Sequence, residues 1–99
     1  MILYVNACAR PDSRTDRLAR ALLQKLGPYE ELRLYDEPLR PMDAHRIALR
    51  DALLSQKDYG AEMFRYARQF AAAEQIVLSA PLWDLSFPAQ LKIYLENIF

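Results

Sequence analysis

Apolar and polar residues repeat along the chain with two periods, one typical of strands and one typical of helices. Apolar runs at residues 2–5 and 76–78 predict strands that are buried on both faces, as in the interior of a parallel sheet. In residues 29–35, leucines alternate with charged residues, which predicts a half-buried edge strand. Helical spacing of apolar residues predicts four helices, at about residues 15–26, 43–56, 59–74 and 89–97.

Strands that alternate with helices indicate the fold class. The order strand-helix-strand-helix-helix-strand-helix is typical of an α/β domain with a parallel sheet and right-handed crossovers. A chain of 99 residues forms at most one domain, residues 1–99, with a thin core. Because loops at the carboxyl ends of parallel strands lie on one side of the sheet, loops 6–15 and 80–88 are expected to meet at one crevice.

The first helix is predicted to follow directly from loop 6–15. Asp12 or Ser13 is a suitable N-cap, and Gly27-Pro28 ends the helix. Its apolar face is expected to contain leucines that recur every four residues and their apolar neighbours: Leu18, Leu22 and Leu26, with Ala19 and Leu23 beside them.

Composition and charge narrow the class of protein further. Thirteen basic and thirteen acidic residues give no net charge, which argues against a nucleic-acid or membrane partner. The single cysteine excludes an internal disulfide and favours a reducing compartment. No apolar run is long enough to span a membrane, and Met1 leads directly into a strand, so no signal peptide is expected. A cytoplasmic domain is therefore expected.

Loop 6–15 is the first candidate binding site. It leaves a parallel strand and enters a helix, where backbone N–H groups are unpaired and the helix dipole is positive. Two hydroxyl groups, of Ser13 and Thr15, and two guanidinium groups, of Arg10 and Arg14, are clustered there. Phosphate groups bind at such helix N-termini, so this loop predicts an anion site.

The same loop permits a second interpretation, in which Cys8 is a nucleophile. The spacing Cys-x5-Arg-Thr, from Cys8 to Arg14 and Thr15, resembles the phosphate loop of low-molecular-weight tyrosine phosphatases. A phosphatase or an arsenate-reductase-like enzyme would use the thiolate to attack its substrate. Pro11 removes one backbone N–H from such a loop and Asp12 adds negative charge, so a small buried Cys8 with no chemical role is the third possibility.

The second loop carries the more specific signal. Residues 76–95 read IVLSAPLWDLSFPAQLKIYL, and this segment strongly resembles the flavodoxin-like NAD(P)H oxidoreductases, the family of FMN-dependent quinone and azo reductases. The first strand, loop 6–15 and the first helix are also similar to that family.

Neither a metal site nor a histidine base is expected. No cluster of histidine, cysteine and carboxylate residues has metal-ligand spacing, and His45, the only histidine, falls on a predicted surface helix.

The resemblance implies a flavodoxin-like three-layer fold and an FMN site with two ends. Ser13, Arg14 and Thr15 would hold the phosphate, with Cys8 and Arg10 close by. The isoalloxazine ring would be bordered, mainly through backbone amides, by the residues that follow the strand 76–78: Pro81, Leu82, Trp83, Asp84 and Leu85. NAD(P)H would supply hydride to the flavin and a small acceptor such as a quinone would receive it, with no catalytic side chain required.

Two residues of the second loop have alternative roles. Trp83 offers a flat apolar surface to a flavin or quinone, or packs on a neighbouring subunit. Asp84 stands where asparagine is commoner in the family, and its carboxylate would either oppose an anionic reduced ring or cap the helix that follows.

The chain departs from the family in its length. Family members continue for two more strands and a third cofactor loop, so this domain is expected to contain only strands 1–3 of the order 2-1-3-4-5. Strand 76–78 would then be a bare apolar edge. We expect the sequence to be a fragment of a longer protein, whose incomplete site holds FMN weakly or not at all. The alternative is that a homodimer or another edge-strand association covers the edge. A non-catalytic, oligomerising half-domain is therefore the third functional hypothesis.

Overall fold

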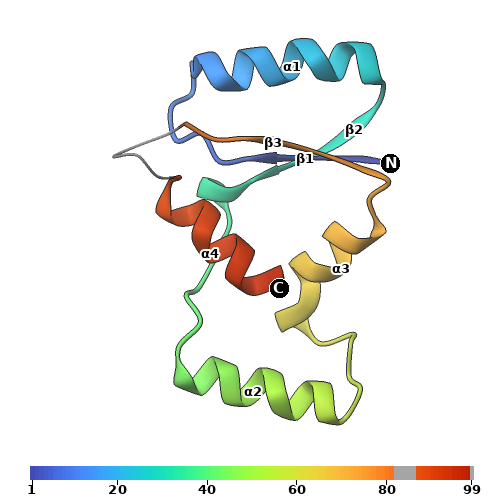
Figure 1. The fold of residues 1–99 in the computed structure, drawn as a ribbon, viewed down its shortest axis with the longest axis vertical. Coiled ribbons are helices and arrows are strands. Elements are labelled where there is room, and N and C mark those ends of the chain that lie inside the picture. Colours follow the sequence, from blue (N-terminus) through green and yellow to red (C-terminus); the bar gives the residue numbers. More distant parts are fainter. Residues whose placement is uncertain (82–86, 99) are drawn as a thin grey trace.

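The computed structural model describes residues 1–81 and 87–98 and contains a three-stranded parallel sheet (Figure 1). Its strands follow the order β2-β1-β3, with Ile2 of β1 opposite Tyr29 of β2 and Gln75 of β3. The elements are β1 (Ile2–Asn6), α1 (Arg14–Leu26), β2 (Tyr29–Arg33), η1 (Leu34–Asp36), α2 (Ala44–Ser55), η2 (Glu62–Phe64), α3 (Arg65–Ala72), β3 (Gln75–Ser79) and α4 (Ala89–Ile98). The predicted α/β class and the strand order 2-1-3 are confirmed.

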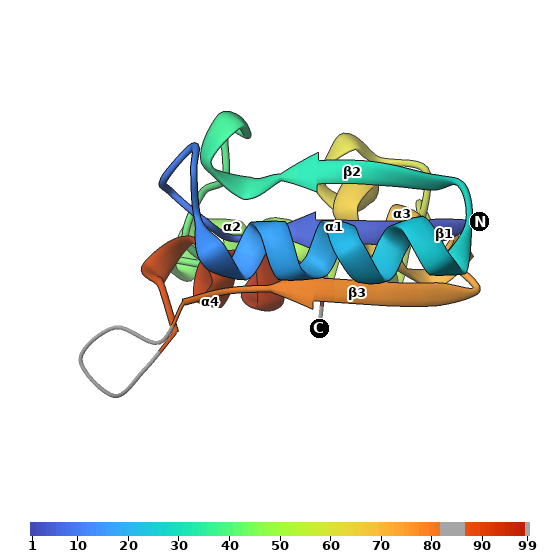
Figure 2. The same ribbon diagram turned by 90° about the horizontal axis from the view of Figure 1, so that it is seen from above.

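Helices cover the two faces of the sheet unequally. Helix α1 lies along one face, over β1 and β3, and α3 and α4 lie on the other face (Figures 1 and 2). Helix α2 lies beyond α3 and α4, away from the sheet, and has no buried residue (Figure 1). All five residues of the central strand β1 are buried. Within the described residues, no helix is long and apolar enough to cross a membrane.

Helix α1 buries a different face from the one its leucine spacing predicts. Leu18 is 75% exposed, and Leu22 and Leu26 are also exposed. The residues that contact the sheet are Ala19 and Leu23. The predicted apolar face is thus confirmed for Ala19 and Leu23 and wrong for Leu18, Leu22 and Leu26. The difference arises because α1 overhangs the β3 edge, so its leucine row faces open space where no further element of the described chain lies.

Strand β3 is also less buried than its sequence predicts. Ile76 and Leu78 are 37% and 48% exposed, although a strand buried on both faces was expected. Because the order β2-β1-β3 places β3 at an edge, no strand of the described residues covers its outer side, although Val77 packs toward α1. The expectation of a bare apolar edge is therefore confirmed, and the expectation of full burial is wrong.

The third predicted helix, 59–74, is shorter in the structure. Its first residues form a turn and the short η2, and α3 begins only at Arg65. The Arg68 guanidinium, which belongs to α3, donates hydrogen bonds to the backbone carbonyl oxygens of Tyr59 and Ala61 at 2.8 and 2.7 Å. In a longer helix, backbone N–H groups would bond to these two carbonyl oxygens instead.

The two faces of β1 have different chemistry. Toward α3 and α4, side chains of the sheet, η1 and the helices form an apolar cluster of Leu3, Val5, Ala7, Leu32, Leu34, Tyr66, Leu91 and Tyr94. Toward α1, a smaller apolar cluster of Ile2, Tyr4, Ala19 and Leu23 adjoins buried polar side chains. We call these two regions the apolar layer and the polar layer. The polar layer lies directly beneath the loop that joins β1 to α1.

Candidate functional site

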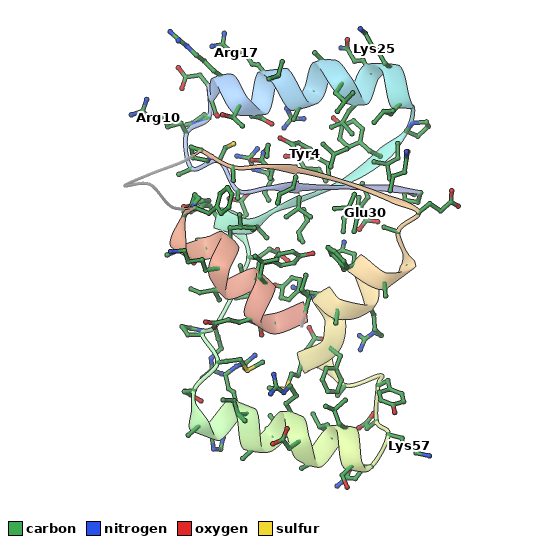
Figure 3. All side chains as sticks on the ribbon, viewed as in Figure 1. Tyr4, Arg10, Arg17, Lys25, Glu30 and Lys57 are labelled. Atoms are coloured by element: carbon green, nitrogen blue, oxygen red, sulfur yellow. The ribbon has the colours of Figure 1, made fainter. Side chains whose placement is uncertain are left out.

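A cavity of about 590 Å³ opens at the carboxyl ends of β1 and β3. Figure 3 shows Arg10 and Arg17 at this end of the molecule, with Lys25 at the opposite end of α1. Most of the residues that line the cavity come from the loop after β1 and the first turn of α1: Cys8, Ala9, Arg10, Asp12, Ser13, Arg14, Arg17 and Pro81. The structure therefore brings together four of the five residues predicted for the phosphate end, together with Pro81 from the second loop.

The N-terminus of α1 retains hydrogen-bond donors that no protein group uses. Ser13 is the N-cap, and its Oγ accepts a hydrogen bond from the Asp16 N–H at 3.3 Å. In the described part of the chain, the N–H groups of Arg14 and Thr15 have no acceptor. Free N–H groups at a helix start, combined with the helix dipole, favour an anion. Of the two caps considered from the sequence, the structure uses Ser13.

The side chains that line the cavity are mainly positive, as is the N-terminal end of the α1 dipole. Three guanidinium groups, of Arg10, Arg14 and Arg17, line the cavity, and Asp12 is the acidic residue among its lining. None of the three arginines forms an ion pair within the described residues. The site therefore offers planar donors suited to phosphate oxygens.

Thr15 differs from the other predicted residues, because it lies on the far side of the helix start. It lines a groove of about 490 Å³ between α1 and β3, together with apolar residues such as Leu18, Leu22 and Leu78. Its backbone N–H still belongs to the α1 N-terminus. A contact between the Thr15 hydroxyl and a phosphate therefore remains a prediction.

Cys8 lies beneath the loop rather than at its surface. Its side chain is 4% exposed, its N–H donates to Asn6 Oδ1 at 2.9 Å, and its Sγ lies 3.5 Å from Ser79 Oγ. No guanidinium group of the described residues is hydrogen-bonded to Sγ. A thiolate nucleophile requires cationic or N–H partners and access to substrate, so this arrangement favours a packing role for Cys8.

The ring end of the predicted site is only partly described. Pro81 contacts the cavity, and the Ala7 N–H donates to the Ser79 carbonyl oxygen at 2.8 Å, which joins the start of loop 6–15 to the end of β3. Leu82, Trp83, Asp84 and Leu85 lie outside the described residues. Their contact with an isoalloxazine ring remains a prediction.

A buried hydrogen-bond network, which the sequence did not reveal, supports the cavity from below. The Asp16 carboxylate is its centre: Tyr4 OH donates to Oδ1 at 2.5 Å, Asn6 Nδ2 donates to Oδ1 at 3.3 Å, and Arg20 Nε donates to Oδ2 at 3.1 Å. Arg20 also pairs with Glu31 of β2 at 2.9 Å. Figure 3 shows Tyr4 between α1 and the sheet. Two features of the sequence could have indicated this network: Tyr4 lies in an otherwise aliphatic strand, and Asp16 and Arg20 have the i, i+4 spacing of a helical ion pair.

Burial and hydrogen bonding set the protonation states in this network. Burial, and then the hydrogen bond to Asp16, raise the pKa of the Tyr4 hydroxyl well above its usual range, so Tyr4 remains a neutral donor. Burial alone would lower the pKa of Arg20, but its hydrogen bonds to Asp16 and Glu31 raise it. Arg20 thus lies between the carboxylates of Asp16 and Glu31. Glu31 also pairs with Arg33 at 3.3 Å, and the neutral donors Tyr4 and Asn6 further stabilise the carboxylate of Asp16.

Metal ligation has no support in the described part of the chain. There, no three histidine, cysteine, aspartate or glutamate side chains are arranged to hold a metal ion. The candidate binding groups of the cavity are therefore the arginine side chains, the Ser13 hydroxyl and the N–H groups of Arg14 and Thr15.

Comparison with known proteins gives consistent results over the whole chain. A family model described as a flavodoxin-like fold matches residues 1–99. FMN-dependent NADH:quinone oxidoreductase 2 of Clostridium acetobutylicum is 35% identical over 106 residues, which cover 98% of this chain and 52% of that protein. FMN-dependent NADH:quinone oxidoreductase of Clostridium beijerinckii is 31% identical and is covered to 53%.

A solved structure shows the same arrangement of elements. The crystal structure of an azoreductase from Bacillus anthracis matches with a TM-score of 0.80 and 26% identity, over 99% of this chain and 54% of that one. The chain thus spans about half the length of the curated relatives it matches.

Proposed function

Because the chain belongs to the family with the flavodoxin-like fold, we propose that it forms the phosphate-binding half of an FMN-dependent NADH oxidoreductase. The observation that supports this proposal is the cavity at the α1 N-terminus, with the Ser13 hydroxyl and with three arginines and two N–H groups that have no partner among residues 1–81 and 87–98. The names of the relatives support FMN as cofactor and NADH as donor. A small quinone or an azo compound is the proposed acceptor, and the reducing interior of the cell is the proposed location.

The residues present fit the phosphate of FMN. Arg10, Arg14 and Arg17 would neutralise its charge, and the N–H groups of Arg14 and Thr15 would donate to its oxygens. The chain's part in the reaction is to bind and orient the cofactor and to limit solvent access at the ring end. When bound, FMN supplies the hydride-transfer chemistry, so no acid or base of this chain is assigned to it.

The phosphatase alternative receives less support from the geometry. Cys8 is buried and its thiol lies against Ser79 Oγ, and Asp12 adds a negative charge to the cavity that a phosphoester would enter. We therefore favour an anion site without a nucleophile.

A titration that compares FMN with riboflavin tests the proposal, because riboflavin has the same ring but no phosphate. We expect FMN to shift the NMR signals of the Ser13, Arg14 and Thr15 amides, and riboflavin at equal concentration to leave them unchanged. In the variant Arg10→Gln/Arg14→Gln, FMN affinity should fall by roughly 10-fold or more, since a charge-assisted hydrogen bond contributes about 1.5–3 kcal/mol. Lys57→Gln, at the far end of the molecule, is the control for loss of a positive charge away from the cavity (Figure 3).

Two results would overturn the proposal. The first is an FMN titration that leaves these loop amides unchanged in the folded chain. The second is a double variant that binds FMN as tightly as the unmodified chain does.

We also infer that the β3 edge and the leucine row of α1 are covered by another polypeptide segment. Ile76, Leu78, Leu18 and Leu22 are exposed, and the groove between α1 and β3 is apolar. About half of each relative lies outside the match. We therefore assign the segment that covers this edge and groove as a strand and a helix that correspond to the unmatched half of the relatives.

Analytical ultracentrifugation tests this surface. The chain should self-associate weakly if at all, and Leu78→Lys should leave its sedimentation unchanged. A tight homodimer that Leu78→Lys abolishes would show that a second copy covers the edge and would contradict the assignment.

A further inference from the structure

The hydroxyl of Tyr4 lies beneath the cavity and contacts both the first turn of α1 and the end of β3. It donates to Asp16 Oδ1 in the first turn of α1 at 2.5 Å and lies 2.6 Å from Ser79 Oγ at the end of β3. We propose that Tyr4 is a positioning residue, which holds the anion loop and the start of the second loop at a fixed separation. This inference rests on the proposed function only for the identity of the ligand.

The contacts form a continuous chain beneath the anion loop. Cys8 Sγ lies 3.5 Å from Ser79 Oγ, which contacts Tyr4 OH, and Tyr4 OH in turn donates to Asp16. The Asp16 N–H then donates to Oγ of the N-cap Ser13. The loop between Cys8 and Ser13 is therefore attached at both ends to one buried hydroxyl.

We assign this role to Tyr4 rather than to a charged neighbour, because among the described residues the Tyr4 hydroxyl bonds to Asp16 and Ser79 and to no other polar group. Asp16 is also held by Asn6 and Arg20, so its position does not depend on Tyr4 alone. Among the described residues, by contrast, the side-chain partners of Ser79 are Tyr4 OH and Cys8 Sγ. Removing the Tyr4 hydroxyl therefore removes the hydrogen-bonded link between the Ser79 side chain and α1, while the backbone hydrogen bond from Ala7 to Ser79 remains and the ring continues to fill its place in the layer.

The chain contains a matched control for this substitution. Tyr94 of α4 is 1% exposed and Tyr4 is 0% exposed, so both rings are fully buried. Among the described residues, the Tyr94 hydroxyl has no hydrogen-bond partner, and the residue belongs to the apolar layer. Tyr4→Phe and Tyr94→Phe thus remove the same atom from equally buried rings, but only the first breaks a connection between the two loops.

The first measurement uses Cys8, the single cysteine of the chain, as a reporter of loop opening. Its reaction with a small aromatic disulfide reagent should be roughly 10-fold faster in Tyr4→Phe, which loses the hydrogen bonds to Asp16 and to Ser79. The rate in Tyr94→Phe should equal that of the unmodified chain. Labelling at several low urea concentrations separates local opening, which is insensitive to urea, from global unfolding, which is not.

The second measurement asks whether the separation of the loops matters for a ligand. Inorganic phosphate needs only the anion loop, whereas FMN extends toward the second loop. In Tyr4→Phe, FMN affinity should fall several-fold while phosphate affinity stays within a factor of two, on the order of the error of such titrations. A general loss of structure would weaken both ligands equally, so the ratio of the two affinities separates positioning from folding.

The outcomes distinguish this inference from the proposed function. Equal Cys8 labelling in Tyr4→Phe and the unmodified chain overturns the positioning role, whatever the ligand. Parallel losses of FMN and phosphate affinity also overturn it. If the unmodified chain binds neither FMN nor phosphate, the proposed function fails, and the labelling contrast still decides the role of Tyr4.

Discussion

The two faces of the β-sheet are built from different interactions. Beneath α3 and α4, eight buried residues form the apolar layer, and aromatic rings such as Tyr66 and Tyr94 meet edge to face at 6.0 Å. Beneath α1, the polar layer contains two carboxylates, a guanidinium and several neutral donors in one network. The apolar layer holds the chain folded, and the polar layer fixes the position of groups under the candidate site.

This difference has a physical basis. Apolar contacts are non-directional and scale with buried area, so they stabilise without fixing one arrangement of nearby loops. Hydrogen bonds and ion pairs are directional, and a buried network with one partner removed is strongly disfavoured. The following predictions test this division between stability and placement.

The largest loss of stability is expected from the apolar layer. Leu34 of η1 is fully buried there, so Leu34→Ala should lower the free energy of unfolding by about 2–5 kcal/mol. Leu18→Ala removes the same atoms from an exposed position and should change it by less than about 0.5 kcal/mol. Urea denaturation followed by circular dichroism measures both, and equal losses in the two variants would contradict the division.

The next effect comes from the cation of the polar layer. Arg20→Met removes the ion pair of Asp16 and one of the two ion pairs of Glu31, which keeps Arg33, and we expect a loss of about 1–3 kcal/mol. The Arg20 side chain is 36% exposed, so the lower part of this range applies. Arg17→Met, on the same helix but without an ion pair among the described residues, is the control. Equal stability of the two variants in urea would show that the network contributes nothing.

Two tyrosine substitutions compare the layers at a single atom. Tyr4→Phe leaves Asp16 and Ser79 with fewer partners and should cost about 1–2 kcal/mol. Tyr94→Phe removes a hydroxyl with no partner, so its stability should be unchanged or slightly higher. Thermal and urea unfolding of the pair at pH 7 provides the measurement, and a larger loss for Tyr94→Phe would reverse the interpretation.

The smallest effect is a dependence of stability on alkaline pH. Burial raises the pKa of Tyr94 to about 12, so the folded state favours the neutral phenol. The resulting stability is fully present below pH 10, the usual tyrosine pKa, and is lost as the pH rises from about 10 to 12. At pH 10.5 the loss attributable to Tyr94 should be about 1 kcal/mol or less.

Urea midpoints of the unmodified chain and of Tyr94→Phe, measured between pH 8 and 10.5, test this dependence. The decline should be shallower in Tyr94→Phe. Tyr59→Phe, at an exposed position, is the control and should decline as the unmodified chain does. An identical decline in Tyr94→Phe would contradict the prediction.

The fold and half of the site were predictable from local pattern. The aliphatic run of β1, the leucine alternation up to Leu34 and the helical spacing of α1 are local signals, and together they predicted a parallel sheet. The strand order 2-1-3 was implied by the resemblance to the flavodoxin-like family, and the structure confirms it. The cluster of Arg10, Ser13 and Arg14 at a strand-to-helix loop predicted the anion cavity for the same reason. These features depend on residues that are close in sequence.

The amino-acid sequence by itself therefore determined the elements, their class and the chemistry of the first loop, because periodicity and capping act within a few residues. Only the tertiary structure decided which face of α1 is buried and that Leu78 is exposed, because both depend on what lies beyond the β3 edge. It also decided that Tyr4 joins Asp16 to Ser79, residues that are 63 positions apart. Such contacts arise from the packing of α1 on the sheet, which no local pattern specifies.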